Sequence, residues 1–224
     1  MPPEGRNTEP LFSAAEMRRR REALRAELDR RGLSHAFVYG ANRSGGAVSW
    51  LTGWPVTREA LLVAGADETD DVLYVSFYNH VPQARRLSLV PVEWTGRNAI
   101  ATALDRLDSG GVRPARVGVI GPLPFWHHQA LTGSGTEVVD LNPAHTAMRL
   151  VKSAEEVAAL RRAAALTDTA VGALERALRE GVTEHELVAE MERSYVAAGG
   201  LHHIHYLAAT AMDDPALCVP AQWP

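Results

Sequence analysis

A change of pattern near residue 142 constrains the fold of this chain more than any other feature. Before it, short runs rich in β-branched and aromatic residues alternate with runs of helical periodicity, a pattern that builds a sheet with helices on its faces. The sequence predicts strands at 35–40, 59–65, 71–76, 89–94, 116–121 and 136–141, with helices at 43–52, 80–88, 98–107 and 124–132. An acidic turn joins 59–65 to 71–76, so we expect a hairpin there and a mixed sheet.

A charged helix precedes this series. Ser13 and Glu16 have the spacing of a capping box at its start, and Gly32 is placed to end it. The run Arg18–Arg21 lies within the helix and is surrounded by acidic residues. We therefore interpret the run as a solvated helix face, not as a surface for nucleic acid or membrane. Residues 1–10 are polar and proline-rich and are predicted to be a flexible tail.

Beyond residue 142 the pattern becomes helical. After a connector at 142–153, capping boxes at Ser153 and Thr183 predict helices that run to about Glu180 and Ala198. A strand at 201–210 follows. The apolar stripes of two such helices need a sheet to cover, and one strand makes no sheet. We expect the missing elements to lie further along a longer protein, on another chain, or in the N-terminal sheet.

These observations give three segments. We expect a tail at 1–10, an α/β domain at 11–148 and the start of a second domain at 149–224, with the boundary at 146–152. The net charge of −4 and the pI of about 6.1 do not indicate a nucleic-acid binder. A single cysteine, Cys218, excludes an intrachain disulfide. With no apolar stretch long enough for a membrane span, we expect a cytoplasmic protein without membrane contact.

Several short motifs have ordinary structural interpretations. RVGVIGP at 116–122 lacks the glycines and the lysine of a nucleotide loop, so we interpret it as a buried strand that ends in a turn. Asp213-Asp214 precedes a proline, which is typical of a turn. Cys218 has no CxxC partner and is expected to be a bystander thiol. His127-His128 is interpreted as a surface or interface feature of a helix.

The stretch LHHIHY, 201–206, holds three of the nine histidines. On a strand, His203 and His205 share one face, while His202 and Tyr206 lie on the other. Two histidines on one face could hydrogen-bond an anionic substrate, could be structural, or could ligate zinc if a third ligand were near. No third ligand is evident in the neighbouring sequence, and the three interpretations remain open.

Three ordered motifs together resemble one family. They are SWLTGW at 49–54, RLVKSAEEVAALRRAAALTD at 149–168 and GVTEHEL at 181–187. In this order and spacing they resemble the creatinase/Xaa-Pro peptidase family, from about residue 11 to the end of the chain. The resemblance implies an α/β fold: an N-terminal mixed-sheet creatinase-like domain with flanking helices, followed by the start of an α+β "pita-bread" catalytic domain.

The family's activity is implied by the same resemblance. Its metallopeptidases hold two divalent metals (Mn, Co or Zn) with two Asp, one His and two Glu, and they form homodimers whose N-terminal domains reach the partner's site. We expect those ligands to lie beyond Pro224, so that this chain holds no cofactor itself. Creatinase, a relative that is not a peptidase, cleaves another C–N bond without metal by using histidine. We therefore expect part of a hydrolase acting on a peptide or amide-like C–N bond, inactive as this chain alone.

The sequence departs from the peptidase pattern near its end. HHIHYLAATAM stands where peptidases have a Phe-Asp-x-Ile-Val-x-Ser-Gly-like strand, and Pro220 lacks the histidine that usually follows. The substrate-binding residues that we expect are His203, His205, Tyr206 and His202, with a protonated imidazole holding a carboxylate. Two alternatives remain: a non-catalytic dimerisation or binding module, and one chain of a split enzyme.

Overall fold

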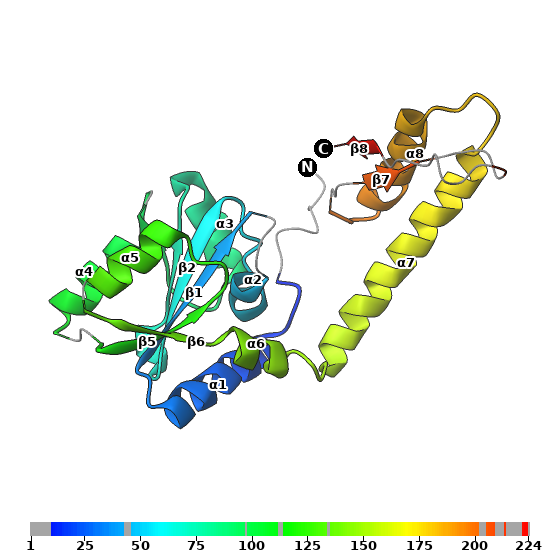
Figure 1. The fold of residues 1–224 in the computed structure, drawn as a ribbon. Helices are drawn as coiled ribbons and strands as arrows, with labels where there is room; N and C mark the ends of the chain where they lie inside the picture. The colour runs from blue at the N-terminus through cyan, green and yellow to red at the C-terminus, as the bar shows by residue number, and fades with distance from the viewer. Residues whose placement is uncertain are drawn as a thin grey trace. The chain divides into compact units, whose positions relative to one another are not determined.

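A computed structural model describes residues 10–42, 46–96, 98–111, 114–133, 135–201, 205–208, 213 and 221–223. The chain divides into two compact units, Met1–Glu155 and Glu156–Pro224 (Figure 1). Residues 1–9 of the expected tail lie outside the described residues. No helix within the described ranges is long and apolar enough to cross a membrane.

The first unit is built on a six-stranded mixed sheet, as the sequence predicts. Its strands are β1 (His35–Ala41), β2 (Glu59–Gly65), β3 (Val72–Val75), β4 (Val92–Trp94), β5 (Arg116–Ile120) and β6 (Glu137–Asp140). Their order is β4-β3-β2-β1-β5-β6. Only β2 runs against the others, since β1–β2 and β2–β3 are antiparallel while β3–β4, β1–β5 and β5–β6 are parallel. The expected hairpin is β2–β3.

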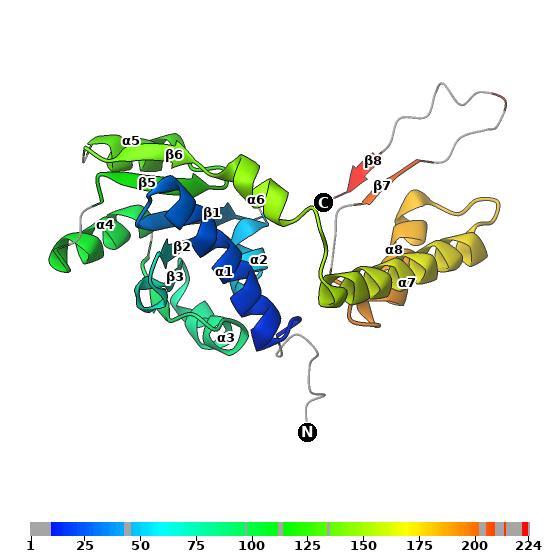
Figure 2. The ribbon, with the colours of Figure 1, turned by 90° about the horizontal axis from the view of Figure 1, so that it is seen from below.

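Helices cover both faces of this sheet (Figure 2). They are α1 (Ala14–Arg31), α2 (Ala47–Thr52), α3 (Val81–Leu87), α4 (Ala99–Ser109), α5 (Phe125–Gly133) and α6 (Asn142–Met148). One core packs residues of α1, α2 and α3 against the sheet, and the other packs residues of α4 and α5. The prediction of a plain connector at 142–153 is wrong for its first half, because α6 forms there and starts with a proline in its first turn.

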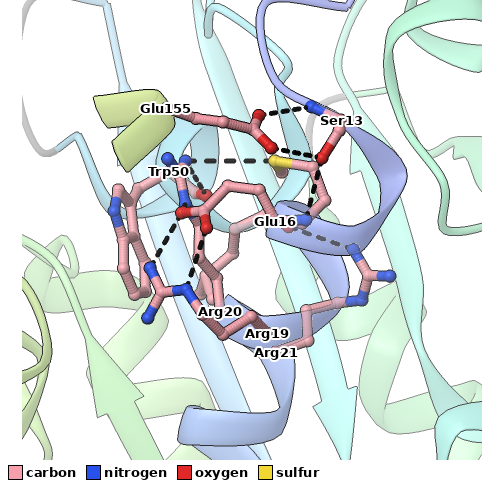
Figure 3. Close-up of polar contacts among 9 residues, drawn as sticks. Ser13, Glu16, Arg19, Arg20, Arg21, Trp50 and Glu155 are labelled. Carbon is pink, nitrogen blue, oxygen red and sulfur yellow. Dashed lines mark hydrogen bonds and ion pairs between the residues drawn. The ribbon is translucent and has the colours of Figure 1, made fainter. Parts of the chain in front are cut away.

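The arginine run of α1 corrects a second expectation. Arg18 and Arg19 are exposed, but Arg20 is fully buried and Arg21 is 2% exposed, so half of the run is not a solvated face. The Arg20 guanidinium donates to Glu16 at 2.7 Å and to the carbonyl oxygen of Trp50 at 3.0 Å (Figure 3). It also lies over the ring of Phe12 at 3.9 Å. Flanking acidic residues misled the prediction, because charge composition does not show which helix positions face the sheet.

The N-terminus of α1 is capped from far along the chain. The Ser13 hydroxyl accepts a hydrogen bond from the Glu16 amide, as a capping box requires. The Glu16 carboxylate, however, binds Arg19 and Arg20. The Ser13 amide donates instead to the carboxylate of Glu155 at 2.8 Å, and the Ser13 hydroxyl donates to it at 2.5 Å (Figure 3). Glu155 therefore takes the part expected of Glu16.

The second unit contains most of α7 (Ala154–Ala177), α8 (Glu184–Val196) and a ribbon of β7 (His205–Leu207) with β8 (Ala221–Trp223). The predicted capping box of Thr183 and Glu186 is confirmed at the start of α8. The expectation of a single strand is wrong, because β7 pairs antiparallel with β8. Apolar side chains of α7 remain open to solvent, with Leu160 56% and Val171 55% exposed.

Candidate functional site

The candidate site lies where β7 meets α8 in the second unit. Helix α8 buries Leu187 and Tyr195 on one face, and Glu192 lies one turn before Tyr195 on that side. Positions three residues apart on a helix project together. The helix therefore presents a carboxylate and a phenol side by side.

Two glycines return the chain to this helix. Gly199 adopts φ +94°, a left-handed conformation that favours glycine, and its amide donates to the carbonyl oxygen of Val196. A Cβ on Gly200 would lie 2.6 Å from the ring of Tyr195. The glycine pair thus ends α8 and lets the backbone pass tightly over Tyr195.

His205, at the start of β7, makes two contacts with α8 through one ring nitrogen. Its Nε2 lies 3.0 Å from the Tyr195 hydroxyl and 3.3 Å from Oε1 of Glu192. The rings of His205 and Tyr195 meet edge to face at 5.9 Å. The His205 side chain is 16% exposed, so the imidazole is held in place while it keeps access to solvent.

Tyr206 points the other way. Successive side chains of a strand lie on opposite faces, and Tyr206 is 64% exposed while His205 packs toward α8. His202 and His203 lie outside the described residues. Of the four residues that the sequence nominated, the structure therefore describes two and places them on opposite faces of β7.

A histidine held in this way can exchange hydrogen bonds with a ligand. A carboxylate beside one ring nitrogen orients the ring and leaves the other nitrogen for chemistry. Glu192 and Tyr195 were missed by sequence reasoning. The available signal was their spacing of three residues on a helix that runs directly into a histidine-rich strand.

A second polar cluster lies on β1 and β2, the two central strands of the first unit's sheet. The Tyr39 hydroxyl donates to Glu59 at 3.0 Å, and Nε2 of His127 lies 3.9 Å from the same carboxylate. His127 lowers the pKa of Glu59, and burial raises the pKa of Tyr39. His127 is only 1% exposed, so the expectation of a surface histidine pair is wrong for it. It faces inward because α5 packs this position on Tyr39, at a ring separation of 5.7 Å.

The remaining motifs have structural roles or fall outside the described residues. RVGVIGP contains β5, and the turn follows at Gly121, whose amide donates to the side chain of Asn142 at 2.9 Å. The prediction of a buried strand ending in a turn is confirmed. Asp213 is an exposed turn residue, whereas Asp214 and Cys218 lie outside the described residues.

No metal centre can be assembled from the residues described. Within those ranges, no group of three or more His, Cys, Asp and Glu side chains could hold a metal ion. The site of β7 and α8 offers one imidazole and one carboxylate, which falls short of the five ligands that the resemblance implies for two metals. The described residues therefore do not fit a centre that holds two metals.

Comparisons with known proteins agree with this fold. Residues 20–151, more than half of the chain, match the creatinase/prolidase N-terminal domain. A creatinase from Bacillus sp. (strain B-0618) is 26% identical over 204 residues, covering 85% of this chain and 49% of its own length.

Solved structures give the same result. An X-Pro aminopeptidase from Thermotoga maritima superposes with a TM-score of 0.68 at 13% identity, over 82% of this chain and 50% of its own. A prolidase from Pyrococcus horikoshii gives 0.65 at 18%, over 80% and 49%. At these identities the likeness shows the fold alone. The chain spans about half the length of each of these relatives.

Proposed function

Because this chain belongs to the creatinase/prolidase N-terminal domain family, we propose that it forms the N-terminal portion of a hydrolase that cleaves a peptide or amide-like C–N bond. The observation that carries the proposal is the extent of the similarity. The match to creatinase covers 85% of the chain, more than the first unit holds, and therefore continues into the second unit. A protein that used only the N-terminal fold would not need similarity to creatinase beyond that fold.

In this proposal each unit has its own task. The α/β unit supports assembly, in a homodimer, and the second unit is the start of a pita-bread catalytic domain. Substrate is bound by His205 together with His202, His203 and Tyr206. The protein acts in the cytoplasm. The two divalent metals, where a relative uses them, belong to residues other than those described.

The chemistry at His205 supports a role in binding. Its imidazole is fixed by two contacts to α8 and keeps one exposed edge. A fixed ring loses little conformational freedom when it binds a ligand, so each hydrogen bond to that ligand is stronger in free-energy terms.

The test is a hydrolysis assay with two forms of the protein. Xaa-Pro dipeptides and creatine are offered, with and without Mn²⁺, to the isolated 224-residue chain and to the intact protein purified from its source. We expect C–N bond cleavage by the intact protein and none above the blank by the isolated chain. Full turnover by the isolated chain would contradict the assignment of the machinery to other residues.

A second candidate function is a non-catalytic dimerisation or binding module. It is favoured by large aromatic side chains that remain exposed beside the C-terminal ends of β3, β4 and β5: Tyr78 (74%), Trp94 (54%), Phe125 (72%) and Trp126 (65%). The rings of Tyr78 and Trp94 meet edge to face at 5.9 Å, and exposed apolar side chains that lie together mark interaction surfaces. An intact protein that forms a stable dimer but cleaves none of the substrates would favour this candidate. A split enzyme would instead recover activity on adding a partner chain that supplies the missing groups.

A further inference from the structure

The two contacts of His205 bear on which of its nitrogens carries the proton. Both Tyr195 and Glu192 approach Nε2, at 3.0 Å and 3.3 Å. A carboxylate only accepts hydrogen bonds, whereas a tyrosine hydroxyl can donate or accept. A lone pair on Nε2 would face the negative charge of Glu192. The arrangement is therefore favourable only when Nε2 carries the hydrogen, and Nδ1 is then unprotonated in the neutral ring.

The other ring nitrogen, Nδ1, takes no part in these two contacts. The side chain is 16% exposed, so part of the ring faces solvent. An imidazole anchored through one nitrogen by a carboxylate presents the other as a stronger base.

We propose that Glu192 and Tyr195 are positioning residues that hold His205 in its Nε2–H form, so that Nδ1 is the nitrogen that meets the substrate. This inference rests on the proposed function for its substrate, but its geometry is a property of this chain alone. Tyr195 supports the ring twice, through its hydroxyl and through the edge-to-face contact at 5.9 Å.

The same contacts narrow the chemistry of the substrate. If the ring were protonated to hold a carboxylate, Glu192 would already balance its charge at 3.3 Å and would repel the second carboxylate. A neutral ring instead offers the Nδ1 lone pair to a donor. The site therefore favours a substrate group that carries N–H, such as an amide or an amidine, over a carboxylate anchor.

The experiment measures the tautomer directly, on the ¹⁵N-labelled 224-residue chain. Long-range ¹H–¹⁵N correlation spectra, recorded over a series of pH values, identify the protonated nitrogen from the pattern of ring couplings. We expect Nε2–H in the wild type. Glu192→Ala should lower the ratio of Nε2–H to Nδ1–H by about tenfold, toward that of an unstructured histidine peptide. Glu192→Gln, whose amide oxygen can still accept, should restore most of the ratio.

Matched variants separate positioning from general damage. Glu190 lies on the same helix and pairs with Arg193 at 3.0 Å, so Glu190→Gln should leave the His205 spectrum unchanged. Tyr195→Phe keeps the ring and removes the hydroxyl, and it should shift the His205 nitrogen resonances. An Nδ1–H tautomer in the wild type, or a ratio unaltered by Glu192→Ala, would overturn the proposal. Because the readout needs no turnover, it stands or falls separately from the hydrolysis assay.

Discussion

Arg19 and Arg20 donate to the same carboxylate of Glu16, yet the Arg19 side chain is 45% exposed and that of Arg20 is 1% exposed. A comparison of the two arginines therefore separates the effect of burial from the effect of charge, because both donate to the same anion. The two arginines also lower the pKa of Glu16 to about 2, with Arg19 making the largest contribution.

Removing the buried arginine should be far more costly. Arg20→Ala leaves the Glu16 carboxylate and the Trp50 carbonyl oxygen without their buried partner, and we expect a loss of about 3–5 kcal/mol in the free energy of unfolding. Arg19→Ala should cost less than about 1 kcal/mol, because its ion pair is partly screened by water. Urea unfolding of both variants measures the difference, and equal losses would contradict the assignment of burial as the cause.

Acid should destabilise the first unit through His145. Burial, with Arg149 nearby, lowers the pKa of His145 from 6.5 to about 4. Between pH 6.5 and about 4, the unfolded chain therefore binds a proton at His145 that the folded chain does not bind. Stability should fall as the pH drops from 6.5 toward 4, by about 3 kcal/mol from this residue.

Two substitutions test this pH effect, one at His145 itself and a control at His128 on another helix. His145→Phe should flatten the acid side of the stability profile, since an aromatic ring still packs edge to face on Trp50. His128 is exposed, and His128→Gln should leave the profile as in the wild type. A His145→Phe profile that keeps the full wild-type slope would exclude His145 as the source.

The turn after β5 should tolerate no side chain. Gly121 has φ +99°, and a Cβ there would lie 2.0 Å from the carbonyl oxygen of Tyr39. Gly121→Ala should lower the melting temperature by several degrees or prevent folding. Gly133→Ala is the matched control, because nothing lies within 4 Å of its added Cβ, and its melting temperature should stay near that of the wild type.

The cap of α1 should couple residues that are 142 positions apart. Ser13→Ala removes the hydroxyl that caps α1 and should cost about 1 kcal/mol. With Glu155→Gln it should show less than additive loss, since both changes break the same contact. Ser13 lowers the pKa of Glu155, so the coupling should be present at neutral pH and vanish as acid protonates that carboxyl group. A double-mutant cycle at two pH values measures this, and strict additivity at neutral pH would refute the contact.

Local pattern was enough to predict most of the sheet. β-Branched runs and turn residues placed all six strands, and the acidic turn between β2 and β3 correctly predicted the hairpin. The burial of individual side chains in the tertiary fold was not predictable in the same way. Arg20 and His127 have ordinary polar surroundings in the sequence, and only the packing of α1 and α5 on the sheet buries them.

The site shows the same division. The histidine-rich stretch drew attention to β7, but β8 was missed because its three residues carry no strand pattern of their own. Glu192 and Tyr195 contact His205 only because the Gly199-Gly200 turn brings His205 back to α8. Contacts that depend on such a return cannot be inferred from spacing alone.

A substrate-binding role of His205 is tested by the specificity constant of the intact protein with its best substrate from the assay panel, compared between wild type and His205→Asn. If His205 binds substrate, kcat/KM should fall by at least about tenfold, the equivalent of one hydrogen bond to a ligand, while His128→Asn leaves it unchanged. An unaltered kcat/KM in a folded His205→Asn protein would contradict substrate binding by His205.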